Sequence, residues 1–453
     1  MRITPADRRV DLDPRDPAFY RDPYPAYAAI RAACPQFYWE QLGYWCFAAH
    51  DDVSALLRDR RFGRQILHRA TRDELGWAEP AAHLAPFLAF EQHSLLELEP
   101  PTHTRIRAMV NPPFIPRRVE RLRPRIAQLA HALIDGFAGQ DSVDLLADFA
   151  AALPGAVIAG FLGVPDAMVP QLLAWSHDMV AIYQIRRDRA IEDRAVAATV
   201  AFSAYVRGVL AERRGAAPAL SAAALSAAAS ALGGCPIHST NATDAEETPD
   251  TLADLLAARD AHGHPLSDDE LVTTVILLLN AGHEATVHAI GNGVAALLTH
   301  EADPAAAFLA DPVAHVEEML RFDAPLHLFT RYALEDLEYR GIPLRRGDTV
   351  GLLLAAANRD PARYPDPDRY HPSRPSNIPV SLGAGAHACV GAPLARLELQ
   401  TALRVLFERL PHLRLAGPPV VSDSWHFRGL TSLRVTMHDA VRQAARAATP
   451  ETR

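Results

Sequence analysis

The chain has 453 residues, 49% of them hydrophobic and 22% charged, a balance typical of a globular protein with a large buried core. The formal net charge of -9 argues against a general nucleic-acid binder, because such proteins neutralise phosphates with basic residues. Cys34, Cys46, Cys235 and Cys389 form no CxxC pair, which argues against a disulfide scaffold or a cysteine zinc knuckle and favours a reducing cytoplasm.

Neither a secretory signal nor a membrane span is expected. The first residues, MRITPADRRVDLDPRDP, lack the apolar segment of a signal peptide. A transmembrane helix needs about 18 or more apolar residues with few charges, and no such run occurs.

The first elements along the chain are strands and the later ones are mostly helices. Residues 36–50 alternate in polarity and carry aromatic side chains, which predicts a strand pair. From about Pro101 the chain is expected to be mostly helical. Pro112 and Pro113 end one short helix, and LRPRIAQLAHALIDGF opens a longer one with apolar spacing of three and four. Residues 215–248 are rich in Ala, Ser and Thr, which indicates an exposed insertion or flexible loop.

The strongest predicted helix starts near residue 268. Ser267 and Glu270 form a capping box ahead of LVTTVILLLNAGHEATVHAIGNGVAALLTH. A helix of roughly 30 residues is about 45 Å long. Its first half is apolar on all sides and is therefore expected to be buried. Further on, TVGLLL at 349–354 and the late SLRVTM segment predict small sheets.

The most informative stretch is SLGAGAHACVGAPLARLELQTALRVLFERL, in which the strand-like NIPVSL leads into a glycine-rich loop and then an amphipathic helix. Cys389 lies where the loop meets the helix. Unpaired backbone N–H groups and the positive end of the helix dipole favour the thiolate form there. Gly383, Gly385 and Gly391 allow positive φ and close backbone approach to a flat group. These features suit a thiolate ligand to a bulky metal cofactor.

Two other interpretations of this loop are possible. Gly383, Gly385 and Ala388 match the dinucleotide pattern GxGxxA, again between a strand and a helix. That fold also needs an acidic residue at the end of a second strand, and the following HLRLAG segment has none. A buried cysteine in an ordinary turn would explain Cys389 alone, but not the pattern around it.

The run from Gly383 to Arg396, G-x-G-x-H-x-C-x-G-x-x-L-A-R, resembles the haem-binding loop of bacterial cytochromes P450. The resemblance implies a mainly α fold with small β-sheets (α+β), in the triangular-prism architecture of that family. It implies one domain over residues 1–453, interrupted by the insertion at 215–248. It also implies haem b as the cofactor and Cys389 as the iron ligand. Leu382 stands where the family has an aromatic residue, which bears on packing and redox tuning beside the thiolate.

Glu318 and Arg321 are three residues apart on one predicted helix face, where they can form an ion pair. By resemblance this is the buried pair of the family, completed by Arg369, with Arg374 the less favoured partner. A haem also brings two propionates, which need cationic donors. Four residues match the family's propionate ligands: His103 and Arg107, which share a helix face, and Arg331 and His387.

The segment from Ala281 to Thr286 resembles the oxygen-binding segment of the family. By that resemblance Ala281 and Gly282 leave room for dioxygen beside the haem, and Glu284 delivers protons through water. Ala285 stands where the family has threonine, and Thr286 points about 100° away around the helix. Our hypothesis is that water or a substrate hydroxyl supplies the missing hydrogen bond. His283 and His288 are five residues apart, so they do not form the HExxH pattern of a zinc helix.

By resemblance, an apolar pocket opposite Cys389 binds a small hydrophobic organic substrate. Its candidate residues are Asn280, Leu328, Phe329, Tyr183 and Phe427. The implied reaction is insertion of one oxygen atom from O2 into a C–H bond. No flavin or iron–sulfur motif occurs, so separate donors, a ferredoxin and its reductase, are expected. The alternatives are a peroxide-driven enzyme, a coupling or rearrangement enzyme, or a haem sensor, against which Glu284 and the Ala281–Gly282 pair argue.

Overall fold

The computed structural model describes all residues except 138, 185–186, 216–249, 376–377 and 438–453. The described chain forms two compact units. We call one the sheet unit; it consists of Met1–Glu79, Arg123–Pro154 and Glu284–Arg453. We call the other the helical unit; it consists of Pro80–Leu122 and Gly155–His283. The single-domain assignment stays a prediction, and the expected insertion at 215–248 lies, apart from Gly215, outside the described residues.

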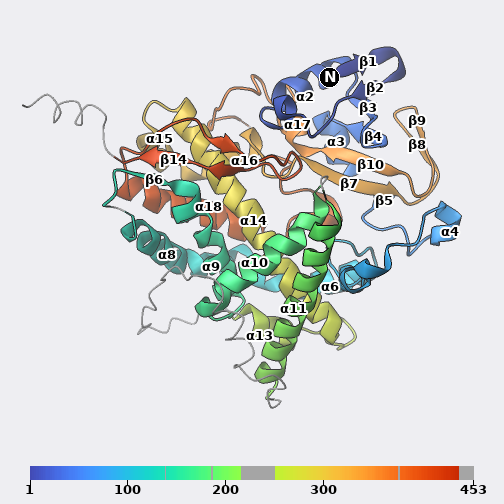
Figure 1. The fold of residues 1–453 in the computed structure, drawn as a ribbon, viewed down its shortest axis with the longest axis horizontal. Coiled ribbons are helices and arrows are strands. Elements are labelled where there is room, and N and C mark those ends of the chain that lie inside the picture. Colours follow the sequence, from blue (N-terminus) through green and yellow to red (C-terminus); the bar gives the residue numbers. More distant parts are fainter. Residues whose placement is uncertain (138, 185–186, 216–249, 376–377, 438–453) are drawn as a thin grey trace, which may run out of the picture. The chain divides into compact units, whose positions relative to one another are not determined.

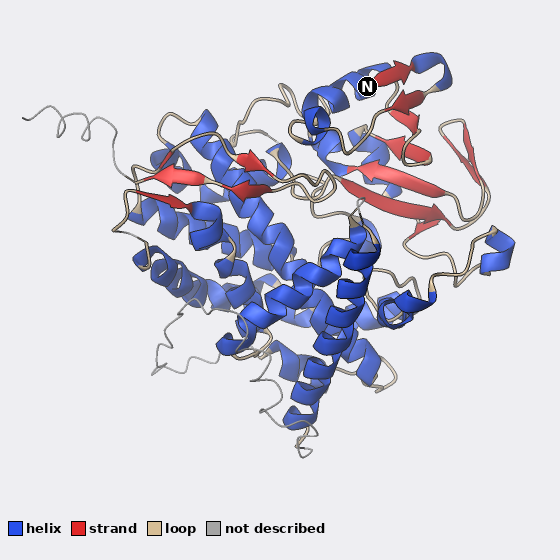
Figure 2. Ribbon diagram, viewed as in Figure 1, coloured by secondary structure: helices blue, strands red, loops and turns tan. Residues whose placement is uncertain are grey.

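All strands of the described residues belong to the sheet unit (Figure 2). The largest sheet has seven strands in the order β1-β2-β3-β4-β10-β7-β5, and three smaller sheets pair β11-β14-β6, β12-β13 and β8-β9. The strands are β1 (Arg2–Thr4), β2 (Arg9–Asp11), β3 (Gln36–Trp39), β4 (Tyr44–Phe47), β5 (Phe62–Gly63), β6 (Ser142–Asp144), β7 (Leu328–Ala333), β8 (Leu337–Tyr339), β9 (Ile342–Leu344), β10 (Thr349–Leu353), β11 (Arg414–Leu415), β12 (Val420–Val421), β13 (Leu430–Ser432) and β14 (Arg434–Thr436). The predicted strands near 349–354 and in SLRVTM are therefore confirmed as β10 and β14.

The predicted strand pair at 36–50 is confirmed as the antiparallel hairpin β3–β4, with Tyr38 opposite Trp45. Gly43 closes its turn at φ +75°, a conformation that favours glycine. Side chains alternate across β3, so Phe37 and Trp39 are fully buried in the core cluster of this unit.

Along the chain, the helices of the sheet unit alternate with its strands (Figure 1). They are α1 (Pro17–Tyr20), α2 (Tyr24–Ala33), α3 (His50–Leu56), α4 (Arg72–Leu75), α8 (Arg123–Asp135), α15 (Pro304–Ala310), α16 (Pro312–Phe322), α17 (Leu354–Asn358) and α18 (Ala392–Arg409), with short 3-10 helices at Pro5–Asp7 and Gly385–His387 and a π-helix at Leu146–Ala150. Helix α18 packs against α8, α15 and α16, which buries its apolar face.

The helical unit has no strand among its described residues. Its helices are α5 (Ala85–Glu91), α6 (Thr102–Val110), α7 (Pro116–Val119), α10 (Val169–Val180), α11 (Arg189–Arg213) and α13 (Thr251–Ala257), with short turns at Ala82–Leu84, Pro112–Phe114, Glu120–Leu122, Asp166–Met168 and Ala181–Tyr183. Helix α9 (Ala152–Phe161) starts in the sheet unit and continues into this one. Among the described helices, α11 alone is long and apolar enough to cross a membrane, a test that core helices of non-membrane proteins also pass.

The long predicted helix is confirmed as α14 (Asp268–His300), which has 33 residues and contributes to both units. The predicted capping box is present: the Ser267 backbone N–H donates to Glu270 Oε2 at 2.9 Å, and the Glu270 N–H donates to Ser267 Oγ at 3.2 Å. Residues 271–276 are all buried, as the apolar pattern predicted.

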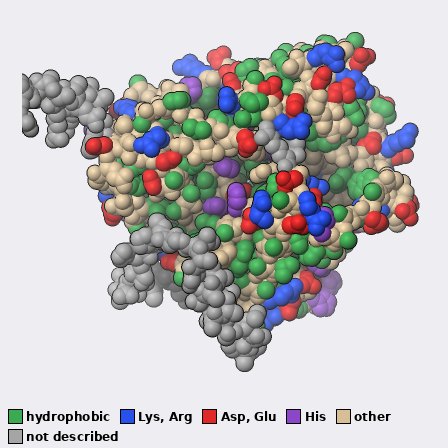
Figure 3. Space-filling view, in the orientation of Figure 1, with side chains coloured by type: hydrophobic (Ala, Val, Ile, Leu, Met, Phe, Trp, Pro, Cys, Tyr) green, Lys and Arg blue, Asp and Glu red, His purple; other side chains and the backbone are tan. Residues whose placement is uncertain are grey.

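The strand predicted for NIPVSL is wrong over its described part, which forms turns. The Val380 N–H donates to the side chain of Asn358 at 2.9 Å, and the Val380 carbonyl accepts the Gly383 N–H at 2.8 Å. Because a side chain and a tight turn satisfy these groups, no strand ladder forms. On the visible face of the molecule, basic and acidic side chains are interspersed (Figure 3).

Candidate functional site

The cysteine loop runs from Leu382 to Gly391 in the sheet unit, and its Cys389 forms no disulfide and is exposed. The Cys389 N–H donates to the Leu382 carbonyl at 2.9 Å, which closes the loop. Helix α18 starts directly after it, with Gly391 as N-cap. The sulfur therefore lies three residues before the first helical residue, next to the end where N–H groups are unpaired.

Glycine is required within this loop by geometry. Gly383 and Gly385 have φ values of +69° and +72°. A Cβ on Gly385 would also meet the Leu57 carbonyl oxygen and lie 3.0 Å from Arg58 Cα, both backbone atoms just after α3. A Cβ on Gly391 would lie 3.9 Å from Cys389 Sγ, an ordinary contact. The loop is thus folded tightly against α3 and leaves its thiol outside.

A cation lies close to the thiol. Arg396, on the first turns of α18, donates to both carboxylate oxygens of Glu317, with the Nη2–Oε2 distance at 2.9 Å. The pKa of Arg396 is raised by this hydrogen bond first, and the charge of Cys389 contributes to the same shift. The guanidinium and the start of α18 together favour a thiolate at Cys389.

Arg331 and His387 are the two propionate candidates in the sheet unit. Arg331 is 3% exposed on β7, and its Nη1 donates to the Thr330 carbonyl at 2.8 Å. Phe329 lies two residues earlier, on the same face of that strand. A Cβ on Gly383 would come within 3.6 Å of the Phe329 ring, so this face of β7 adjoins the cysteine loop. His387, in the short turn before Cys389, is partly exposed.

The predicted ion pair between Glu318 and Arg321 is present on α16, with both side chains fully buried and a nitrogen–oxygen distance of 2.7 Å. The prediction that Arg369 completes it is wrong. Arg374, buried in the same loop, places its Nε 3.3 Å from Glu318 Oε1. Arg369 is exposed and contributes only its backbone carbonyl, which accepts from Arg321 and Arg374. The loop turns the Arg369 side chain outward and the Arg374 side chain inward.

Helix α14 is buried on both sides of the Ala281–Ala285 segment but not within it. Ala281 is exposed, and Gly282, Glu284 and Ala285 are partly exposed. Thr286 is 6% exposed, so its hydroxyl and the Ala285 methyl group face different surroundings, as the 100° step per residue predicts. The lack of a side chain at Gly282 also matters locally, since a Cβ there would lie 3.0 Å from Ile158.

Besides Ala281 and Gly282, four predicted site residues lie in the helical unit. His103 and Arg107 are both on α6; His103 is 2% exposed, and Arg107 Nε donates to Asn111 Oδ1 at 2.7 Å. Asn280 faces Met179 on α10, where its Nδ2 contacts the sulfur at 3.8 Å. Tyr183 donates its hydroxyl to Glu91 at 2.7 Å.

The other substrate-pocket candidates lie in the sheet unit. Leu328 is 5% exposed within the core cluster and packs against Gly351, so core packing accounts for its apolar character. Phe329 adjoins the cysteine loop, as described above. Phe427 is partly exposed, and its ring centroid lies 4.8 Å from that of His426. Of these three residues, Phe329 lies beside the cysteine loop at Gly383, and the substrate roles of all three stay predictions.

One buried acidic residue was not predicted from the sequence: Glu398 on α18, which is 2% exposed. Its Oε1 has no hydrogen-bond partner among the described residues, and burial raises its pKa to about 8. The group is therefore protonated at neutral pH. An acidic residue on an amphipathic helix gives no sign in the sequence that it faces inward.

Because the pKa of Glu398 is raised, we expect the free energy of unfolding to depend on pH. Its ordinary pKa of 4.5 applies to the unfolded chain and its raised pKa of about 8 to the folded one. The folded state thus binds the extra proton, so the free energy of unfolding is expected to fall as pH rises from about 4.5 to 8. Urea unfolding between pH 5 and pH 9 measures this. The decline should be smaller in Glu398→Gln but unchanged in Glu408→Gln, an exposed position on the same helix; equal slopes in all three proteins would contradict it.

The described residues argue against the two other kinds of site, a zinc helix and a dinucleotide-binding fold. No group of three or more His, Cys, Asp or Glu side chains among the described residues can hold a metal ion, which agrees with the argument against a zinc helix. The largest sheet is mixed rather than doubly wound and parallel, which rules out the dinucleotide fold. The cysteine loop fits a haem instead: it offers an exposed thiol to iron, glycine backbone to a flat ring and a neighbouring buried guanidinium.

A cysteine loop of this geometry, followed in the same unit by a helix and supported by a buried glutamate–arginine pair, defines a haem-thiolate protein. The family model "Cytochrome P450" matches residues 313–422. The chain is 35% identical over 428 residues to vitamin D(3) 25-hydroxylase of Pseudonocardia autotrophica, covering 92% of this chain and 94% of the relative. It is 34% identical to the cytochrome P450 monooxygenase PikC of Streptomyces venezuelae, covering 90% and 89%.

Solved structures of cytochromes P450 are also similar to this chain. P450BioI, determined in complex with an acyl carrier protein ligated to hexadec-9Z-enoic acid, is 29% identical and superposes with a TM-score of 0.79, covering 93% of this chain and 99% of that one. The chain belongs to the cytochrome P450 family. It is a haem-binding monooxygenase with the mainly helical fold of that family.

Proposed function

We propose that this monooxygenase inserts one oxygen atom from O2 into a C–H bond of a small hydrophobic organic substrate, using electrons from a separate ferredoxin and ferredoxin reductase. Two electrons and two protons reduce the second oxygen atom to water, and the substrate C–H becomes C–OH. The observation that carries the proposal is the exposed Cys389 thiol, placed by a glycine loop beside Arg396 at the start of α18.

In this proposal Cys389 ligates the iron, and Gly383 and Gly391 let the loop backbone approach the haem plane. Arg331 and His387 bind propionate oxygens through their N–H groups. His103 and Arg107 lie in the helical unit, and their propionate roles stay predictions from the resemblance. Held by a thiolate, the haem supplies dioxygen activation and oxygen-atom transfer.

Glu284 is the proposed proton carrier. Its carboxyl group is partly exposed on α14, so it can exchange a proton with water and pass it on within the site. Ala281 and Gly282 are proposed to leave space beside the haem for dioxygen. Thr286 lies about 100° around the helix from Ala285, so we propose that water or the substrate supplies the hydroxyl that orients that proton.

The Ala285→Thr variant tests the substrate-assisted form of this hypothesis. We expect product formed per NAD(P)H consumed to stay close to that of the unaltered enzyme, because water or a substrate hydroxyl already occupies the place of the missing side chain. The ratio is measured with a substrate found by screening for a shift of the haem Soret band. A large rise in product formed per NAD(P)H consumed would show that nothing replaces the hydroxyl absent at Ala285. It would contradict the substrate-assisted form of the hypothesis.

The substrate class is proposed from the apolar character of the candidate pocket residues. Relatives bear the names vitamin D(3) 25-hydroxylase, 6-deoxyerythronolide B hydroxylase and epothilone C/D epoxidase, which are names of enzymes that oxidise organic compounds. Cytoplasmic localisation is part of the proposal. It is supported by the three cysteines of the described residues, Cys34, Cys46 and Cys389, which form no disulfide, since oxidising compartments favour disulfides.

Reconstitution tests the function. The purified holoprotein, a ferredoxin, its reductase, NADPH and ¹⁸O2 should yield product carrying one ¹⁸O atom, and the Cys389→Ser variant should yield none. The unaltered protein should also show the red-shifted ferrous–CO Soret band of a thiolate-ligated haem. Turnover with NADPH and O2 but without a redox partner would contradict the electron-donor proposal.

The second candidate function is peroxide-driven or non-hydroxylating haem-thiolate chemistry, such as coupling or rearrangement. Ala285 favours it, because this chain lacks the usual hydroxyl that assists O2 activation. Failure with redox partners together with turnover on hydrogen peroxide would select this candidate. A haem sensor is the least favoured alternative, since a sensor has no need of Glu284.

A further inference from the structure

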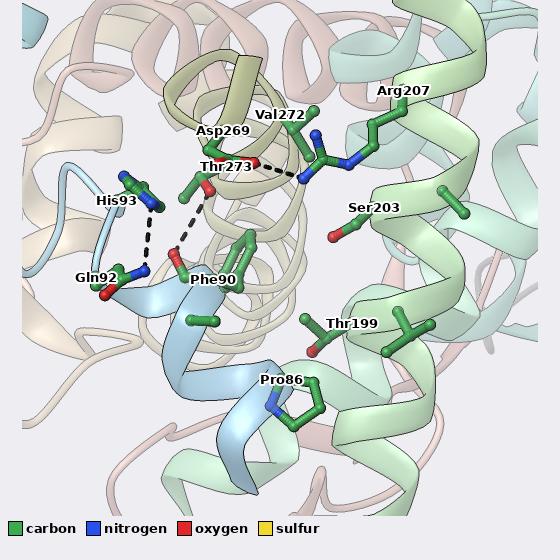
Figure 4. A pocket seen from close by; sticks show the side chains of 13 residues that line it. Pro86, Phe90, Gln92, His93, Thr199, Ser203, Arg207, Asp269, Val272 and Thr273 are labelled. Carbon is green, nitrogen blue, oxygen red and sulfur yellow. Dashed lines mark hydrogen bonds and ion pairs between the residues drawn. The ribbon is translucent and has the colours of Figure 1, made fainter. Parts of the chain in front are cut away.

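The helical unit contains a surface groove of about 370 Å³ that the proposed reaction does not use (Figure 4). Its walls are α5 with the residues just after it, α11, and the first turns of α14, and all of them belong to the helical unit. The lining residues used below are Phe90, His93, Val200, Arg207, Asp269 and Val272.

The floor of the groove is apolar. Phe90 and Val272 are 9% and 2% exposed, and they form a packed surface between α5 and α14. The polar group nearest this floor, the Thr273 hydroxyl, is directed at the Phe90 carbonyl at 3.5 Å (Figure 4). Val200 on α11 is 54% exposed at the opposite wall, although it is a large apolar side chain. A ligand that covers these apolar side chains would remove their surface from water, which favours binding.

The rim of the groove is charged. Arg207 Nη2 donates to Asp269 Oδ1 at 2.6 Å across the space between α11 and α14, as Figure 4 shows. This hydrogen bond, and after it the charges of Arg207 and His93, lower the pKa of Asp269. The Nε and Nη1 groups of Arg207 have no hydrogen-bond partner among the described residues.

An arginine, a histidine and one carboxylate line this rim. Arg207 keeps N–H donors in the planar arrangement that matches a carboxylate, and His93 lies beside the same Asp269. Asp269 is also in the first turn of α14, where the helix dipole favours an anion. Asp269 is therefore the internal competitor that an external carboxylate would displace from Arg207.

We propose that this groove is a second ligand site, which binds a small amphipathic carboxylate. The carboxylate pairs with Arg207, and the apolar body covers Phe90, Val200 and Val272. Asp269 lies 12 residues before Ala281 on the same helix, which is about 18 Å along its axis. The groove is thus separate from the oxygen-binding segment, and a ligand there acts as an effector or a second copy of a substrate rather than as the oxidised molecule.

Calorimetric titration of the holoenzyme with octanoate tests the proposal, with octylammonium and 1-octanol as probes of equal chain length. We expect octanoate to bind most tightly. Its dissociation constant should rise about tenfold in Arg207→Gln, the loss of one charge-assisted pairing. It should fall in Asp269→Asn, because that change removes the competing carboxylate. Opposite effects of two neighbouring substitutions are not produced by simple damage to the fold.

Arg194→Gln is the matched control, since Arg194 is an exposed arginine of the same helix whose partner is Asp178, outside the groove. It should leave octanoate binding unchanged. Equal affinity for the three probes, or no effect of Arg207→Gln, would overturn the proposal. Octanoate binding that shifts the Soret band and ignores Arg207→Gln would place the ligand at the haem. That outcome would remove the second site while leaving the proposed monooxygenase function intact.

Discussion

Replacing Glu318 by alanine is expected to lower the free energy of unfolding by about 3–5 kcal/mol, the cost of leaving buried charge without its partner. Glu318 accepts from Arg321 through both carboxylate oxygens, at 2.7 and 2.8 Å, and also from the backbone N–H of His371 at 2.7 Å. Arg374 adds a fourth donor. Without the carboxylate, Arg321 keeps only backbone carbonyls as acceptors inside the core.

Urea unfolding followed by circular dichroism measures this loss, with the haem Soret band as a second signal. Arg374→Ala should cost about 1–3 kcal/mol, because it leaves Glu318 short of one buried donor. Arg369→Ala should change stability by no more than about 0.5 kcal/mol, since that side chain is exposed. If Arg369→Ala proved the more damaging of the two, the placement of Arg374 as the third member would be wrong.

The features that were predictable from the sequence depend on short spacings. The capping box of α14, the i and i+3 pair on α16 and the loop-to-helix junction at Cys389 each need only local geometry, and all three are present. The β3–β4 hairpin was predictable for the same reason, because alternation over a few residues fixes which side chains are buried.

The features that were not predictable depend on how distant segments meet. Arg369 and Arg374 are both plausible partners of Glu318 by spacing, and only the irregular path of the loop decides between them. Asp366, at φ +49°, is part of that path. The NIPVSL segment has strand-like composition, but Asn358, 22 residues earlier, takes its backbone N–H. Glu398 looks like an ordinary helix-surface residue until α8, α15 and α16 are packed around α18. Tertiary contacts decide all three cases.

The second large effect is expected at Gly385, where alanine should abolish normal thiolate ligation. Two costs combine there. An L-residue at φ +72° is disfavoured by about 1–2 kcal/mol. In addition, the new Cβ meets the Leu57 carbonyl oxygen and lies 3.0 Å from Arg58 Cα, and these backbone atoms cannot rotate away. The loop must therefore shift, and Cys389, four residues further on, shifts with it.

The fraction of ferrous–CO protein with the red-shifted Soret band of a thiolate-ligated haem measures the effect, and we expect most of it to be lost in Gly385→Ala. Gly76→Ala is the matched control: its φ is +65°, but no atom lies within 4 Å of the added Cβ. That variant bears the backbone strain without the clash, so it should lose about 1 kcal/mol of stability and keep a normal spectrum. A normal spectrum in Gly385→Ala would mean that the loop tolerates displacement from α3, and that the tight contact between Gly385 and Leu57 does not position the thiolate.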